Sequence, residues 1–160
     1  MIPAWECTID PLITTPESNS REHWHKKAKR HSQQRESIRK EWKANPISIA
    51  NPENTPLLLY IQRIAPRKLD SSDNLPCSMK AILDEICSCI LPGYVDGRAD
   101  GKLKIKVAYA QEKGIPKQYA VKIKIFVLEK TVSVDLSGCE KLPDTSLYIC
   151  KNCRHPFESP

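Results

Sequence analysis

The spacing of apolar residues changes several times along the chain, and each change predicts a different element. Residues 5 to 13 alternate loosely between apolar and polar side chains and run into a turn rich in Thr, Ser and Pro, which predicts a short strand. Ser18 or Asn19 is a suitable N-cap for a helix that runs to about Ala44. Four apolar residues of this segment lie on one line of the helix and predict a narrow stripe that packs on a sheet: Trp24, Ala28, Ile38 and Trp42.

The two tryptophans of this helix are expected to anchor it in the core. The alternative is that their rings stack on nucleic-acid bases. His31 and Arg35 lie on the same line as the apolar stripe, so the middle of the helix is expected to rise away from the core.

The next two segments have a strand period and then a helix period. Residues 57 to 64 are rich in Leu, Ile and Tyr and predict a buried strand that stops before Pro66. Between Asn74 and about Ile90 the apolar residues recur at intervals of three and four, which predicts a second helix with Asp73 or Asn74 at its N-cap.

The last third of the chain contains two alternating stretches. Residues 103 to 109 and 119 to 128 are expected to pair as a hairpin, and residues 131 to 136 form a candidate edge strand. We therefore predict an α+β fold in which a small mixed sheet of about four or five strands carries two main helices. The expected boundaries are residues 1 to 130 for this domain and 131 to 160 for a C-terminal tail.

The positive charge of the chain is concentrated in one segment. Residues 21 to 43 contain nine Lys or Arg against three Glu, so this segment alone supplies the net charge of +6. A neutral body with one basic arm is typical of a nucleic-acid-binding protein, because neutralising phosphates requires charge gathered on one surface. The alternative is a helix whose charges serve only solubility.

No stretch of the sequence resembles a membrane span or a secretory signal. The chain contains seven cysteines, an odd number. Without an export signal, this number indicates reduced thiols rather than a disulfide framework. We expect a cytoplasmic protein.

Acidic residues surround a lysine in the second half of the chain. Asp70 and Asp73 follow the predicted strand, Lys80 and Asp84 lie on the predicted helix, and Asp100 follows that helix. Converging carboxylates repel each other unless a cation joins them, and their oxygens are the ligands that Mg²⁺ prefers. The alternatives are that Asp73 is only a helix N-cap and that Lys80 only forms a salt bridge with Asp84 or Asp73.

Asp100 can join this group only if the chain returns along the second helix. A helix over residues 74 to 90 carries the chain about 25 Å from its own start. Residues 91 to 100 can stretch at most to about 33 to 36 Å, so the return is feasible with little slack. Asp96, in the same loop, is a substitute for Asp100.

The C-terminal tail contains a weak zinc pattern. Cys150 and Cys153 have the spacing of zinc ligands, with His155 after them and Cys139 upstream. The alternative is a disordered tail with unpaired thiols.

Taken together in their order, these motifs resemble the RusA family of phage and bacterial Holliday-junction resolvases, over roughly residues 9 to 128. The resemblance rests on six ordered segments: Asn19 to Trp24 with the basic run after it, Leu69 to Leu75, Lys80 to Asp84, Gly97 to Asp100, Tyr109 to Gly114 and Tyr119 to Ile125.

The resemblance implies a homodimeric, Mg²⁺-dependent hydrolase that cuts four-way DNA junctions in recombination and repair. It implies that Asp70, Asp73 and Asp100 hold the metal and that Lys80 stabilises charge on the phosphate. Asp70 stands three residues before Asp73, where the family core often has two, which leaves the role of Asp70 open.

The basic helix would bind the DNA arms through six residues: Arg21, Lys26, Lys27, Lys29, Arg30 and Arg35. The alternative function is a non-catalytic DNA-binding module whose Cys-containing tail binds zinc. Under that alternative, the acidic residues only cap helices.

Overall fold

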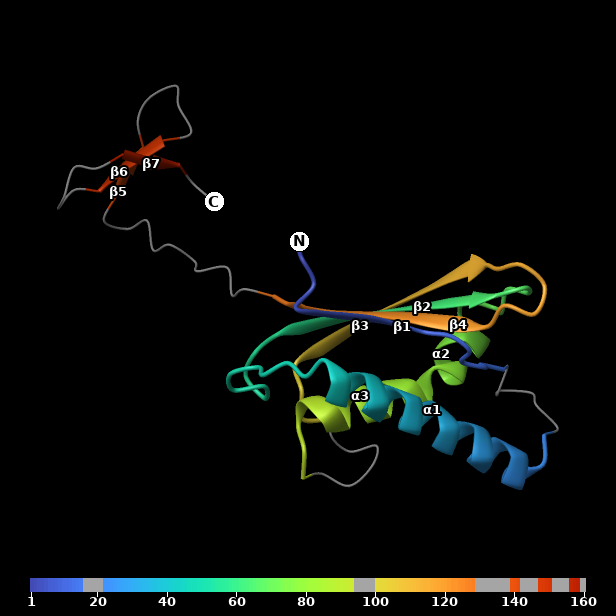
Figure 1. Ribbon diagram of the computed structural model, residues 1–160. Coiled ribbons are helices and arrows are strands. Elements are labelled where there is room, and N and C mark those ends of the chain that lie inside the picture. The colour runs from blue at the N-terminus through green and yellow to red at the C-terminus, as the bar shows by residue number, and fades with distance from the viewer. Residues whose placement is uncertain (16–21, 94–99, 129–138, 142–146, 151–155, 159–160) are drawn as a thin grey trace. The chain divides into compact units, whose positions relative to one another are not determined.

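Strand β2 (Leu57–Ala65) is the centre of a four-stranded sheet with the order β1-β4-β2-β3 (Figure 1). Its residues alternate strictly between buried and half-buried, so one face packs on the core while the other is partly open. On one side β2 runs parallel to β3 (Ile105–Lys113), and on the other antiparallel to β4 (Ala120–Val127), which in turn pairs with β1 (Trp5–Ile9). The predicted α+β fold, a small mixed sheet with two main helices, is confirmed.

The computed structural model describes residues 1–15, 22–93, 100–128, 139–141, 147–150 and 156–158. The chain divides into two compact units, Met1–Glu129 and Lys130–Pro160. In the second unit the described segments form a small antiparallel sheet of β5 (Cys139–Lys141), β6 (Leu147–Cys150) and β7 (Pro156–Glu158). The candidate edge strand over residues 131 to 136 lies outside the described residues.

The predicted hairpin between the last two strands of the domain is wrong. β3 and β4 are not neighbours, because β2 lies between them and pairs with both. Residues 114 to 119 therefore bridge two strand spacings, about 10 Å. The alternation of these strands predicts which face is buried, but it does not specify which strand lies beside which.

Helix α1 (Trp24–Ala44) starts later than predicted. Its N-cap is His23, whose Nδ1 accepts a hydrogen bond from the backbone of His25. Ser18 and Asn19 lie before this N-cap and outside the described residues, so the predicted start of the helix is wrong. Its end at Ala44 is as predicted.

The buried stripe of α1 also differs from the predicted one. Arg30, Gln34 and Ile38 face inward, while Trp24 is 66% exposed and Ala28 is exposed, so Trp24 is not a core anchor. Gln34 is buried because its side chain donates to the Ile13 carbonyl at 2.7 Å. Hydrophobic periodicity cannot reveal such a partner, since it comes from another segment.

The C-terminal half of α1 packs on the sheet as predicted. Ile38 is fully buried, and the Trp42 ring lies 5.2 Å from that of Trp5 on β1. The Trp5 indole also donates to the Asn45 carbonyl at 2.7 Å, which attaches the end of the helix to the first strand.

The predicted second helix is divided in two. α2 (Asn74–Ser78) and α3 (Lys80–Ile90) meet at the buried Met79, which has φ −102° and ψ −2°. α3 packs against α1, where the Arg39 guanidinium makes two hydrogen bonds to the buried Glu85 carboxylate, at 2.6 and 2.9 Å. Both main helices lie on the same face of the sheet (Figure 1).

Within the residues that the structure places, no helix combines the length and the apolar character needed to cross a lipid bilayer.

Candidate active site

The turn after β2 presents Asp70 and Asp73 to solvent. The Asp70 carboxylate accepts hydrogen bonds from the Ser72 backbone and hydroxyl at 2.8 and 2.6 Å. These hydrogen bonds lower the pKa of Asp70. The Asp70 carbonyl accepts from the Leu75 backbone at 2.9 Å, which connects this turn to the first turn of α2.

Asp73 stands at the N-cap position of α2, but its side chain makes no capping hydrogen bond. Its Oδ1 lies 3.5 Å from Cys77 Sγ, and the side chain is exposed. Helix capping, the alternative interpretation of Asp73, is therefore not what this carboxylate does.

Gln111 on β3 holds the segment that leads into this turn. Its side-chain oxygen accepts from the Leu69 backbone N–H at 2.8 Å, and its side-chain nitrogen donates to the Leu69 carbonyl at 2.7 Å. Sequence reasoning missed this residue. The signal that could have found it is the alternation of side chains along β3, which places Gln111 on the same core-facing side as Val107 and Tyr109.

Lys80 joins two carboxylates at the start of α3. Its ammonium lies 2.6 Å from Asp84 Oδ1 and 2.8 Å from Asp100 Oδ2, so the chain does return along the helix as the reach argument allowed. The salt bridge with Asp84, the alternative interpretation of Lys80, is present, and Asp84 is almost buried while Lys80 is half-exposed. Asp96 lies outside the described residues.

The break at Met79 changes the relation between Lys80 and Asp73. On one continuous helix the two would share a face, two turns apart, but Asp73 precedes α2 and Lys80 begins α3. Lys80, Asp84 and Cys77 lie close enough to the Tyr109 hydroxyl to act on it electrostatically.

Lys80, Asp84 and Asp100 form a cluster, called here the lysine cluster, and the charges of Lys80 and Asp100 stabilise each other. Desolvation opposes the Lys80 ammonium, but hydrogen bonds to Asp100 and Asp84 outweigh it and raise the pKa of Lys80. The hydrogen bond from Lys80 lowers the pKa of Asp100. Burial raises the pKa of Tyr109 and brings that of the nearby Cys87 to about 12. At neutral pH Lys80 is therefore an ammonium and Asp100 a carboxylate.

The predicted three-carboxylate metal centre is not assembled in this arrangement. Among the described residues no group of three or more His, Cys, Asp or Glu could hold a metal ion. Asp70 is engaged within its own turn, and Asp100 with Lys80. Because Mg²⁺ is commonly held by one or two carboxylates together with substrate phosphates, the exposed Asp70 and Asp73 fit that mode rather than a three-ligand cage.

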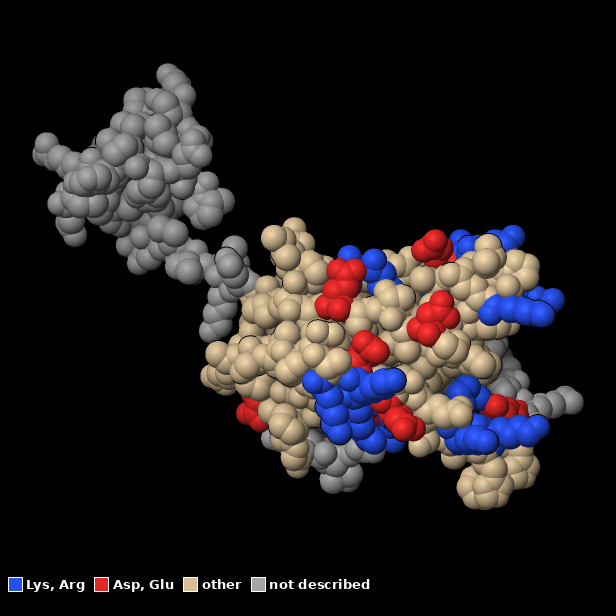
Figure 2. All heavy atoms as spheres, in the orientation of Figure 1, with Lys and Arg blue, Asp and Glu red and all other residues tan. Residues whose placement is uncertain are grey.

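The residues predicted to bind DNA have different environments on α1. Lys26 and Lys29 are exposed, and Lys27 and Arg35 are half-buried. Arg30 is 8% exposed and pairs with Glu22, so it is a structural residue rather than a solvent-facing one. Arg21 lies outside the described residues. In Figure 2 the Lys and Arg side chains gather over the region that α1 occupies in Figure 1, with acidic side chains beside them.

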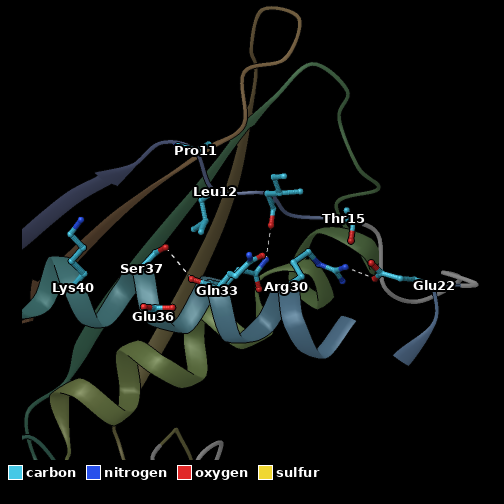
Figure 3. Close-up of a pocket in the computed structure, with 11 residues that line it drawn as sticks. Pro11, Leu12, Thr15, Glu22, Arg30, Gln33, Glu36, Ser37 and Lys40 are labelled. Atoms are coloured by element: carbon cyan, nitrogen blue, oxygen red, sulfur yellow. Dashed lines mark hydrogen bonds and ion pairs between the residues drawn. The ribbon is translucent and has the colours of Figure 1, made fainter. Parts of the chain in front are cut away.

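A hollow of about 680 Å³ lies between the N-terminal segment and α1 (Figure 3). Leu12, Ile13 and Thr15 form one wall, and Gln34 and Ser37 belong to the helix wall. The hollow shares no residue with the lysine cluster or the Asp70 turn. The sticks in Figure 3 show the Arg30–Glu22 pair at one end of it.

Neither the protein-family models nor the curated proteins with which the sequence was compared give a match.

Proposed function

We propose that this protein is a Mg²⁺-dependent endonuclease of the RusA type that resolves four-way DNA junctions. The observation that carries the proposal is the contact between Lys80 and Asp100. These residues are 20 positions apart, the sequence motifs assign both to one site, and their side chains meet at 2.8 Å.

Hydrolysis of a phosphodiester builds negative charge on the phosphate as water attacks. A cation already fixed in position stabilises this charge without reorganising. In the proposed mechanism Lys80 supplies that cation, and Asp84 and Asp100 are positioning residues that hold its ammonium. The raised pKa of Lys80 keeps it charged throughout the physiological range.

Mg²⁺, when bound, would act as a Lewis acid on the scissile phosphate and lower the pKa of a water molecule. Asp70 and Asp73 are the proposed ligands, because both carboxylates are exposed in the turn that follows β2. Asp100 could serve as a third metal ligand only if its carboxylate broke the ion pair with Lys80. The part played by the protein is to hold these carboxylates at the end of β2, where Gln111 attaches their turn to β3.

The start of α1 is the proposed DNA-binding surface. Lys26 and Lys29 are exposed next to Trp24, whose ring lies 3.3 Å from that of His25. Exposed lysines neutralise phosphates, and an exposed aromatic ring offers a stacking surface for an unpaired base. We propose that the protein acts as a homodimer, because a four-way junction must be cut on two opposing strands and a dimer presents two equivalent sites. We propose the cytoplasm as the place where it acts.

Cleavage of a synthetic four-way junction, with and without Mg²⁺, tests this proposal. We expect paired nicks with Mg²⁺ only, loss of cleavage in Asp73→Asn and Lys80→Met, and retained junction binding in both variants. Ser71→Ala, an exposed change in the same turn, is the matched control and should cleave normally. Full cleavage activity of Asp73→Asn would contradict the proposed role of Asp73 as a metal ligand.

A non-catalytic DNA-binding module with a zinc-binding tail is the second candidate. The pairing of β5 with β6 supports it, because Cys139 is the direct register partner of Cys150. Cys153 and His155 lie outside the described residues. Junction binding without cleavage, together with one stoichiometric zinc per purified chain, would favour this candidate.

A further inference from the structure

One face of the four-stranded sheet carries neither of the two main helices (Figure 1). Strand alternation sends the odd-numbered residues of β2 and β4 to the core, so the even-numbered ones lie on this second face, called here the open face. A strand face that is only solvated carries polar side chains. The open face instead has four apolar residues on the two central strands, all half-buried and outside the core cluster: Leu58, Tyr60, Ile64 and Phe126.

The two aromatic residues of the open face are neighbours. Phe126 on β4 is the register partner of Leu58, and Tyr60 follows Leu58 by two residues on the same face of β2. Such diagonal neighbours on antiparallel strands lie about 7 to 8 Å apart. On the other side of Tyr60 its register partner is Ala108 on β3, which is too small to cover the ring. The sheet therefore presents an aromatic pair on two adjacent strands.

Three lysines surround this aromatic pair on the same face. Lys124 is the register partner of Tyr60, while Lys122 and Lys106 lie one row away, on β4 and β3. In the three rows that these residues occupy, Glu6 is the one described carboxylate. Its Oε1 lies 3.0 Å from the Lys122 ammonium and 3.3 Å from that of Lys124. Three positive charges against one negative charge favour an anionic partner.

We propose that the open face binds single-stranded DNA. Two successive bases stack on Tyr60 and Phe126, and the phosphates lie beside the three lysines. Aromatic rings stack on bases of any sequence, but only where the face of the base is not already covered by a neighbouring base pair. Four-stranded sheets in RNA-binding domains stack two or three bases on aromatic residues in the same manner.

The mixture of rings and ammonium groups favours a nucleic acid over a protein partner. A protein surface packed on Tyr60 and Phe126 would remove the three ammonium groups from water, which is costly unless carboxylates meet them. A DNA strand brings a phosphate with every base, so it satisfies the rings and the ammonium groups together. The choice of DNA over RNA rests on the proposed function, whereas the stacking surface does not. The surface is separate from the proposed catalytic site, because Lys80 begins α3 on the other face.

Fluorescence anisotropy of a labelled oligothymidylate of about 12 nucleotides, without Mg²⁺, measures this binding to the full chain. We expect Tyr60→Leu and Phe126→Leu each to weaken binding about tenfold, because leucine keeps the apolar cover of the sheet but offers no ring to a base. Lys106→Gln should lower the slope of log K against log salt by about 0.7. Lys117→Gln, an exposed change in the loop before β4, is the matched control and should keep the wild-type slope. Trp24→Leu, which removes the exposed ring on α1, should have a smaller effect than either sheet variant.

A photochemical crosslink locates the strand independently of affinity. An oligothymidylate with one thymine replaced by iodouracil, irradiated on the wild-type protein, should attach to peptides that contain Tyr60 or Phe126. Far-UV circular dichroism checks that each variant is folded, and the wild-type crosslink needs no variant at all.

Four results would overturn the proposal: wild-type affinity in both sheet variants, crosslinks confined to α1, tighter binding of an oligouridylate RNA of equal length, or sheet variants that lose self-association in sedimentation but still bind the oligothymidylate. The last result would assign the open face to a second copy of the chain. Failure of the wild-type protein to cleave a junction, with the oligothymidylate bound as expected, would count against the nuclease proposal only.

Discussion

The side chain of Gln111 pairs with the backbone of Leu69 in both directions, at 2.8 and 2.7 Å. The Gln111 amide replaces the hydrogen bonds that a neighbouring strand would make, because it pairs with both the N–H and the C=O of Leu69. Leu69 directly precedes Asp70, so the position of the acidic turn relative to β3 depends on this pair. A residue on β3 thereby positions a carboxylate that follows β2.

Removing this amide should therefore impair catalysis more than binding. We expect Gln111→Ala to lower the cleavage rate of a four-way junction about tenfold, because misplacement by a fraction of an ångström is costly at a reacting centre. The dissociation constant for the junction should stay within about twofold of the wild-type value. Gln62→Ala removes an amide from the opposite face of β2 and should cleave normally. Equal losses in both variants would contradict a specific role for Gln111.

The ion pair between Lys80 and Asp100 should contribute to stability in a pH-dependent way. The pKa of Asp100 is lowered from its ordinary 3.8 by the hydrogen bond from Lys80, so its contribution is present above about that value and is lost as pH falls through the lower, folded-state pKa. We expect Asp100→Asn to cost about 0.5 to 1 kcal/mol at pH 7, as partly exposed pairs do. The difference should shrink as the pH falls below 3.8.

Urea unfolding of wild type and Asp100→Asn at pH 7, 4 and 2 measures this difference. Glu36→Gln, which removes an exposed carboxylate on α1, is the control at each pH. A gap between wild type and Asp100→Asn that stays constant down to pH 2 would show that the ion pair is not its source.

The bidentate pair between Arg39 and Glu85 should stabilise the packing of α1 on α3. Arg39→Ala leaves a carboxylate whose side chain is only 4% exposed without its cation, which costs roughly 3–5 kcal/mol for a fully buried pair. Arg39 itself is half-exposed, so we expect a smaller loss, about 2 kcal/mol, in urea unfolding. Lys40→Ala removes a neighbouring exposed cation and should change the free energy of unfolding by less than about 0.5 kcal/mol.

The exposed lysines at the start of α1 should set the salt dependence of DNA binding. Replacing Lys26, Lys27 and Lys29 with Ala should lower the slope of log K against log salt by about 0.9 for each phosphate that is no longer neutralised. Arg30 is left in place because its burial against Glu22 makes it a folding residue. A matched triple variant, Lys102→Ala with Lys104→Ala and Lys117→Ala, should keep the wild-type slope. An unchanged slope in the α1 variant would place the DNA surface elsewhere.

Several features of the fold were determined by local sequence. The strict alternation of β2 and the three-and-four spacing of α3 predict their elements, because side-chain direction repeats every two residues in a strand and every 3.6 in a helix. The contact of Asp100 with Lys80 was also within reach of sequence reasoning, since chain length limits where the loop can return.

Only the tertiary structure decided which segments meet. Periodicity states which face of a strand is buried, but the insertion of β2 between β3 and β4 depends on packing across the whole sheet. Likewise, α1 buries Arg30, for which Glu22 supplies a partner, whereas Trp24 remains exposed at the start of the helix. The pairing of Gln111 with Leu69 follows from the same physical fact. A residue's partners come from distant segments, and their contact energies outweigh local preference.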